Sequence, residues 1–213
     1  MLVLSNLQTI KTSETYRQQI EAAIREGQAL GFSNTPTINP RKAVSDDQIS
    51  RLKELIWKNW VSLQYQVLPA YWGNSCQTLS TNLYAWLVSK KIDADIVYGE
   101  VNVNTTLEFD TTLNGLREEY NSTNHEGSQE LHAWVTIGDD IVLDPGLPHR
   151  LIKNYLHPES LLPSVIIGRA GQLTPEYFPV QHIPMLVGTD FLAKTNSVDP
   201  RVLAQALIAA NAQ

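Results

Sequence analysis

The chain of 213 residues contains a single cysteine. One cysteine cannot form an internal disulfide, and a zinc site built from several thiolates is equally excluded. The sequence also lacks a glycine-rich phosphate-binding loop and the Gly-x-Ser-x-Gly motif that presents a nucleophilic serine. We therefore expect no metal and no cofactor, so any chemistry has to come from the side chains themselves.

Long apolar runs and basic clusters are missing as well. No stretch is apolar enough to span a membrane, and the apolar residues at the N-terminus are too few for a secretory signal. The net charge is −6 without any run of Lys or Arg, which argues against nucleic acid as a partner. We expect a cytoplasmic globular protein with no membrane and no nucleic-acid partner.

The spacing of apolar residues predicts that the first seventy residues are helical. One helix is expected to follow Ser13 as its N-cap and to end near Gly27 or Gly31. A capping box at 45–48 predicts the start of a second, long helix, which Pro69 ends. Its apolar stripe consists of Ile49, Leu52, Ile56, Trp60, Leu63 and Val67. Further helices are expected at 76–89, near 113–120 and from 199 onward.

Alternating or apolar segments between these helices predict strands. They are expected at 96–103, 131–137, 141–143, 164–167 and 180–187. Pro184 interrupts the last of these, which indicates an edge strand. Helices followed by an antiparallel sheet predict an α+β fold. We divide this single compact domain into an N-terminal helical region (1–70), a core (71–190) and a C-terminal helix (191–213).

Cys76 is expected in the first turn of the helix at 76–89, whose apolar stripe is Leu79, Leu83, Trp86 and Leu87. A helix N-terminus favours the thiolate, which is the reactive form of cysteine. Its free N–H groups can also bind the oxyanion of a tetrahedral intermediate. Free cysteines are often only small buried apolar residues, so position alone leaves both interpretations open.

The segment at 131–144 predicts a hairpin that brings a base to a carboxylate. For both apolar sets to face one core, Ile137 has to pair with Ile141 and Val135 with Leu143, across a three-residue loop. This register places His132 diagonal to Asp144 on the opposite face, within reach of a hydrogen bond. Cys76, His132 and Asp144 therefore form a candidate catalytic triad.

The other histidines lack this support. His125, His149 and His157 lie in polar or loop-like surroundings, and His182 lies on the interrupted strand. We assign all four to structure or solvent. A metal site at His149 and His157 with a nearby carboxylate is the alternative for two of them.

At these residues the chain resembles the transglutaminase-like superfamily of papain-like cysteine enzymes. The resemblance covers about 71–145 and consists of the Gly-x-x-Cys entry at 73–76, the helix with Leu83 and Trp86, a strand ending at Gly99, His132-Ala133-Trp134-Val135, and Leu143-Asp144-Pro145. It implies a papain-like core in which the helix that carries the cysteine packs on an antiparallel sheet. It also implies that Cys76 is the nucleophile, His132 the general base and acid, and Asp144 the residue that orients His132.

The chain departs from this pattern beside the cysteine, where Ser75 precedes and Gln77 follows. The Arg-Gly-Gly segment of the related arylamine acetyltransferases is absent, so coenzyme A is not expected. Aromatic residues near the triad are candidates for substrate binding: Trp72, or its neighbour Tyr71, as an oxyanion donor, and Trp134 as part of the cleft. For Trp134, shielding of the pair from water and a plain packing role are the alternatives.

The resemblance implies a peptide or protein substrate. A peptidase or amidase would cleave an amide or ester through a thioester on Cys76. Two alternatives stay open. In the first, an amine instead of water attacks the thioester, which gives transamidation or cross-linking. In the second, the chain is an inactive binding module in which Cys76 is an inert core thiol.

Overall fold

The computed structural model describes residues 2–34, 36, 39, 42–68, 71–122, 131–173 and 179–212, with side chains from residue 15 onward. Local sequence signals set the starts of several helices. Ser45 opens α2 (Asp46–Leu55) in the predicted capping box, and Asp199 caps α8 (Pro200–Asn211). α4 (Cys76–Ser89) has the predicted bounds, and α5 (Leu113–Asn121) covers the predicted short helix.

The first helix is longer than predicted. α1 (Leu2–Ala29) runs through Ser13, so the expected N-cap there is wrong. No glycine or proline occurs between residues 2 and 12, and nothing there forces the helix to end. The chain leaves the helix at Gly31, whose φ of 83° suits the residue after a helix C-terminus.

The second predicted helix contains a π-helical turn that changes its buried face. The turn (Ile56–Trp60) lies between α2 and α3 (Val61–Val67). Ile49, Leu52, Ile56 and Trp60 are buried as predicted, but Leu63 and Val67 are exposed. The wider turn rotates the following residues, so Val61 and Gln64 face the interior instead.

The remaining helical elements were not predicted. They are α6 (Leu147–Tyr155), α7 (Asp190–Thr195) and short 3-10 turns at Trp72–Asn74, Glu159–Leu161 and Ala170–Gln172.

The strands form one antiparallel sheet, which confirms the α+β class. They are β1 (Asp95–Val103), β2 (Thr106–Leu107), β3 (His132–Ile137), β4 (Ile141–Asp144), β5 (Ile166–Arg169) and β6 (Val180–Val187). Their order is β2-β1-β3-β4-β5, and β6 pairs with β1. β5 begins two residues later than predicted, because its partner β4 ends at Asp144 and offers no pairing beyond Ile166. β6 pairs with β1 alone among the described strands, as expected of an edge strand.

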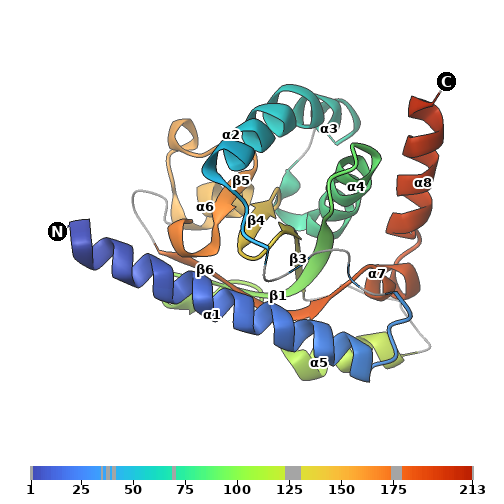
Figure 1. Ribbon diagram of the computed structural model, residues 1–213, viewed down its shortest axis with the longest axis horizontal. Helices are drawn as coiled ribbons and strands as arrows, with labels where there is room; N and C mark the ends of the chain where they lie inside the picture. The colour runs from blue at the N-terminus through green and yellow to red at the C-terminus, as the bar shows by residue number, and fades with distance from the viewer. Residues whose placement is uncertain are drawn as a thin grey trace.

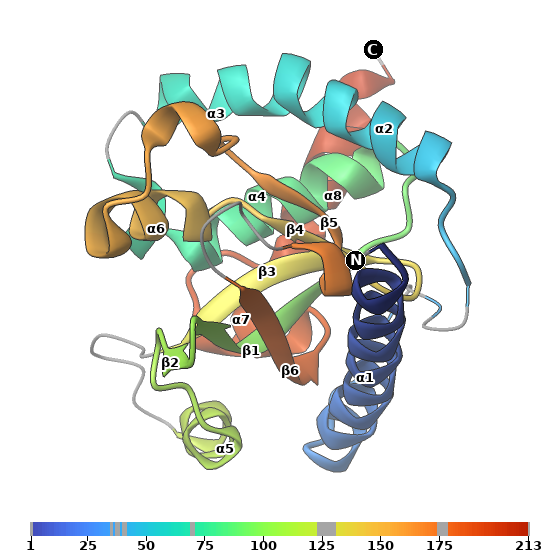
Figure 2. The same ribbon diagram turned by 90° about the vertical axis from the view of Figure 1, so that its left-hand side faces the viewer.

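Helices cover both faces of this sheet (Figures 1 and 2). On one face, α2, α3, α4 and α8 pack against a core that includes Ala133, Val135 and Leu143. On the other face, α1 packs along β6, and its buried residues Tyr16, Ile20 and Ala23 belong to a second core. Trp134 and Val142 belong to this second core as well. Figure 2 shows that the sheet curls between the two groups of helices.

In the described part of the chain, no helix has the length and apolar character needed to cross a membrane.

Candidate active site

Cys76 is the first residue of α4 and lies against the start of β3. Its side chain is 7% exposed, and Sγ donates a hydrogen bond to the Leu131 carbonyl at 3.5 Å. The Ser75 side chain makes no capping hydrogen bond, so it leaves the first N–H groups of α4 uncapped. Figure 1 shows this helix on the same side of the sheet as α3 and α8.

Two contacts hold α4 in register with β3. Four residues after Cys76, Ser80 Oγ donates to the Ala133 carbonyl at 2.9 Å. Four helical residues rise about 6 Å, close to the roughly 6.8 Å that two strand residues span. Because the two rises match, Cys76 at Leu131 and Ser80 at Ala133 fit together, which brings the thiol beside His132.

The hairpin of β3 and β4 has the predicted register. Val135 pairs with Leu143 and Ile137 with Ile141, across the loop that contains Gly138 with a φ of 64°. The structure therefore brings His132 to Asp144, and His132 Nε2 lies 2.7 Å from Asp144 Oδ2. Both side chains are completely buried.

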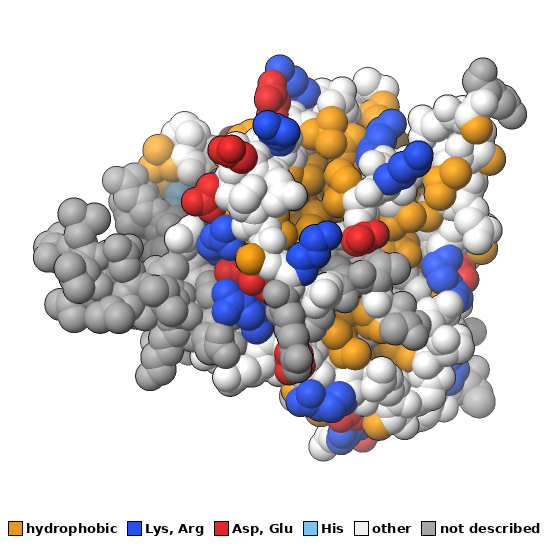
Figure 3. Space-filling model, in the orientation of Figure 1, with side chains coloured by type: hydrophobic (Ala, Val, Ile, Leu, Met, Phe, Trp, Pro, Cys, Tyr) orange, Lys and Arg blue, Asp and Glu red, His pale blue; other side chains and the backbone are white. Residues whose placement is uncertain are grey.

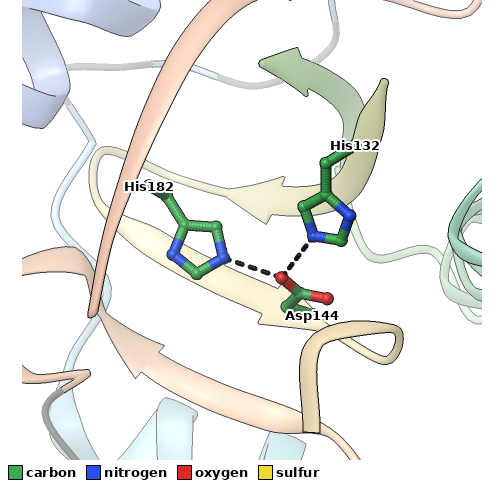
Figure 4. A group of neighbouring side chains, drawn as sticks. All are labelled: His132, Asp144 and His182. Carbon is green, nitrogen blue, oxygen red and sulfur yellow. Dashed lines mark hydrogen bonds and ion pairs between the residues drawn. The ribbon is translucent and has the colours of Figure 1, made fainter. Parts of the chain in front are cut away.

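A second histidine, which sequence reasoning had assigned to structure or solvent, binds the same carboxylate oxygen. His182 on β6 places Nε2 2.8 Å from Asp144 Oδ2 and is also buried (Figure 4). An ionised carboxylate only accepts hydrogen bonds, so Nε2 is the protonated nitrogen of both rings. The proton that His132 can exchange with another group is therefore the one on Nδ1.

Both oxygens of the Asp144 carboxylate accept hydrogen bonds. Its other oxygen, Oδ1, accepts from the backbone N–H groups of Gly146 and Leu147 at 3.0 Å each. Burial alone raises the pKa of Asp144, but the charge and hydrogen bonds of His132 and His182 outweigh it and hold this pKa well below its usual range. Asp144 is therefore an anion at neutral pH.

The same environment favours the charged form of His132. Burial lowers its pKa, but the Asp144 carboxylate, with a smaller contribution from the Cys76 side chain, raises it to about 10. His132 Nδ1 is buried and has no partner of regular hydrogen-bond geometry among the described residues. The imidazole therefore contacts the Asp144 carboxylate through Nε2 and has the Cys76 thiol beside its ring.

Phe109 covers one face of the imidazole and is a further residue that sequence reasoning missed. Its ring stacks on His132 with centroids 4.0 Å apart and an angle of 11°, and the Arg150 guanidinium lies over its other face. The buried Glu100 carboxylate holds this segment in place by accepting the backbone N–H groups of Phe109 and Thr111. These contacts hold the segment that follows β2 over the His132 ring.

The two tryptophans expected to bind substrate lie in the interior. Trp72 is completely buried, and its indole N–H donates to the Leu68 carbonyl at 2.7 Å. Trp134 is also completely buried, and its N–H donates to the Tyr16 hydroxyl at 3.0 Å. Both N–H groups are thus used inside the protein, and Trp72 offers none to an oxyanion in this arrangement.

A cavity among the described residues lies away from the thiol. It measures about 380 Å³ and is lined by Lys91 at the end of α4, Gly138 in the β3–β4 loop and Leu52 on α2. Figure 3 shows hydrophobic side chains gathered on this face, with Lys and Arg around them. Because α4 separates Lys91 from Cys76 by 14 residues, roughly 21 Å of helix, the cavity is distinct from the site.

His132, Asp144 and His182 are also residue types that bind metal ions, and their donor atoms lie within 4.8 Å of one another. Here they are partners of each other, and backbone N–H groups occupy the second oxygen of Asp144. The arrangement is that of a hydrogen-bonded chain. The alternative site at His149 and His157 is not among the metal-type clusters of the described residues. His125 lies outside the described residues.

Comparison with known proteins gives no match to any family model, curated protein or solved structure. The resemblance to the transglutaminase-like superfamily therefore stays a prediction.

Proposed function

We propose that this protein is a cysteine enzyme that transfers or hydrolyses acyl groups through a thioester on Cys76. The observation that carries the proposal is the position of His132, which binds Asp144 through Nε2 and lies beside Cys76. An α-helix that starts at the nucleophile and packs on an antiparallel sheet carrying base and carboxylate also supports a papain-like core of the transglutaminase-like kind. A peptide or protein amide is the proposed substrate.

The proposed reaction begins when the Cys76 thiol leaves the Leu131 carbonyl and gives its proton to His132 Nδ1, which leaves a thiolate beside the imidazolium. Sγ attacks the carbonyl carbon of the amide, and the uncapped N–H groups in the first turn of α4 stabilise the oxyanion. When the C–N bond breaks, His132 Nδ1–H gives its proton to the leaving amine, and a thioester remains. His132 then takes a proton from water, which attacks the thioester and releases the acid and Cys76. Asp144 holds the ring in place throughout.

Alkylation of the only cysteine tests the proposal without any engineering. An unactivated thiol with a pKa near 8.5 reacts slowly at pH 6, because less than about 1% of it is thiolate. We expect Cys76 to react with iodoacetamide at pH 6 at least about tenfold faster than free cysteine, and His132→Ala to abolish the excess. Protein unfolded in guanidinium is the control for access, because it exposes the same thiol without its neighbours.

A slow reaction that rises only near pH 8.5 in folded and unfolded protein would contradict the proposal and favour an inert core thiol. For an active protein, a fluorescent primary amine offered with a glutamine-containing protein separates the two acceptors. A hydrolase incorporates no amine, whereas a transamidase labels the protein.

A further inference from the structure

The proposed reaction leaves one buried titratable group unused, namely His182. We propose that His182 is a positioning residue of the same site, which holds the Asp144 carboxylate from the side opposite His132 and keeps it ionised and turned toward the base. This inference rests on the proposed function and adds a fourth member to the predicted triad.

The geometry shows a shared acceptor. Asp144 Oδ2 lies 2.7 Å from His132 Nε2 and 2.8 Å from His182 Nε2. All three side chains are completely buried. Figure 4 shows the two imidazoles converging on this oxygen from different strands. With the two backbone N–H groups on Oδ1, the carboxylate is held by four donors and cannot rotate without breaking several hydrogen bonds.

The contact between His182 and Asp144 spans the sheet. β6 pairs with β1, β1 with β3 and β3 with β4, so three strand spacings, about 14 Å in a flat sheet, separate the two backbones. The side chains meet because the sheet curls, as Figure 2 shows. Gly99 on β1 supports this approach, because a Cβ there would lie 2.1 Å from the Ile183 carbonyl oxygen and 3.0 Å from the Trp134 ring.

The charges around His182 favour a neutral donor. Burial lowers its pKa, and the nearby imidazolium of His132 lowers it further, although Asp144 acts in the opposite direction. A second proton on His182 Nδ1 would find no acceptor among the described residues. His182 thus supplies one N–H to Asp144 without competing with His132 for the negative charge.

The test compares two replacements of His182. His182→Gln keeps an amide N–H close to the position of Nε2, whereas His182→Leu has a similar size but no donor. Each variant is measured for the rate of Cys76 alkylation between pH 4 and pH 9 and for its thermal midpoint. Val180→Ala is the matched control, because Val180 is a buried residue two positions earlier on β6, where it pairs with Val103 on β1.

We expect His182→Leu to slow alkylation at pH 6 by roughly 10- to 100-fold, the usual effect of losing a residue that orients a ligand or base. The loss of rate should extend over the whole range from pH 4 to pH 9, because the pKa of Asp144 lies well below this range. The groups that face this site are Asp144, His132, Cys76 and Tyr16, and they are the same in all variants. His182→Gln, which keeps a donor for Asp144, should keep the rate of the wild type.

Two results would overturn the inference. In the first, the wild type reacts rapidly, and His182→Leu either keeps the wild-type rate and pH profile or loses no more rate than Val180→Ala does at equal thermal stability. His182 then has a structural role alone, and the proposed function survives. If the wild-type thiol itself shows no activation, both the function and the role of His182 fail.

Discussion

Gly146 packs closely against both Cys76 and His132. A Cβ at residue 146 would lie 3.1 Å from Cys76 Cβ and 3.5 Å from His132 Cε1. The backbone of Gly146 has φ −87° and ψ −37°, which any residue adopts. Glycine is therefore favoured at this position by the lack of space beside the nucleophile and the base.

Gly146→Ala should separate the thiol from the imidazole while the fold persists. Cys76 has to give way by a few tenths of an ångström. Because a displacement of 1 Å costs about 10²-fold in rate, we expect alkylation of Cys76 at pH 6 to fall by about two- to fivefold. Gly168→Ala is the matched control, since its Cβ would also lie 3.1 Å from its nearest neighbour, which is a Leu173 methyl and not a residue of the proposed triad. An unchanged rate in Gly146→Ala with a native circular dichroism spectrum would contradict the tight packing at the site.

The pH dependence of stability should report the ion pair of His132 and Asp144. The folded pKa of His132 is about 10, above the value near 6.5 of an unfolded chain, so its contribution is complete below pH 6.5 and is lost as the pH rises toward 10. The pKa of Asp144 is depressed, so its contribution is present above about pH 4 and is lost as the pH falls further.

We therefore expect the free energy of unfolding, measured in urea, to fall between pH 6 and pH 10 by on the order of 3 kcal/mol more in the wild type than in His132→Gln. The variant lacks the titrating group but shares the other ionisable residues, so the difference isolates the pair. Parallel pH curves for the two proteins would show that the imidazole is not held as a cation.

Glu100→Gln should release the segment that covers His132. The buried carboxylate accepts four backbone N–H groups, those of Val101, Glu108, Phe109 and Thr111. An amide offers one oxygen and turns an NH₂ group toward at least one of these donors, so we expect a loss of about 1–3 kcal/mol in the free energy of unfolding.

Hydrogen exchange locates the effect of Glu100→Gln. Exchange at the amides of Phe109 and Thr111 should accelerate, whereas Glu118→Gln, an exposed substitution on α5, should leave both unchanged. Equal protection of these amides in wild type and Glu100→Gln would show that the carboxylate does not hold the segment.

Gly99→Ala should disrupt the pairing of β1 with β6. The added Cβ would collide with the Ile183 carbonyl, a backbone atom that cannot move alone. We expect a loss of at least about 3 kcal/mol, with early exchange of the β6 amides. Stability within about 0.5 kcal/mol of the wild type would contradict this close approach of the two strands.

Much of the site follows from local sequence patterns. The alternation of Val135, Ile137, Ile141 and Leu143 determines the hairpin register, and the register determines the contact of His132 with Asp144. The apolar spacing after Cys76 likewise predicts where α4 begins. Both inferences involve residues that are close in sequence, where periodicity carries the information.

The rest depends on long-range packing. His182 is separated by an even number of residues from the buried Val180 and Leu186, and this alternation indicates only that its side chain points inward. Its contact with Asp144 also requires the β6–β1 pairing and the curl of the sheet. Phe109 lies in a polar segment without periodicity, so nothing local places it over His132. The buried face of the helix changes beyond Trp60 because of a π-helical turn, which the spacing of apolar residues does not predict.

Detection of an acyl-enzyme tests the central claim most directly. Protein mixed briefly with p-nitrophenyl acetate and quenched in acid should gain the mass of one acetyl group, located by peptide mapping on Cys76 and released by hydroxylamine. Cys76→Ser should gain none at that position, and His132→Ala should acylate at least about 10²-fold more slowly. If Cys76 stays unmodified, or if it is acylated equally fast in wild type and His132→Ala, the thiol is not activated by the imidazole and the proposed chemistry is wrong.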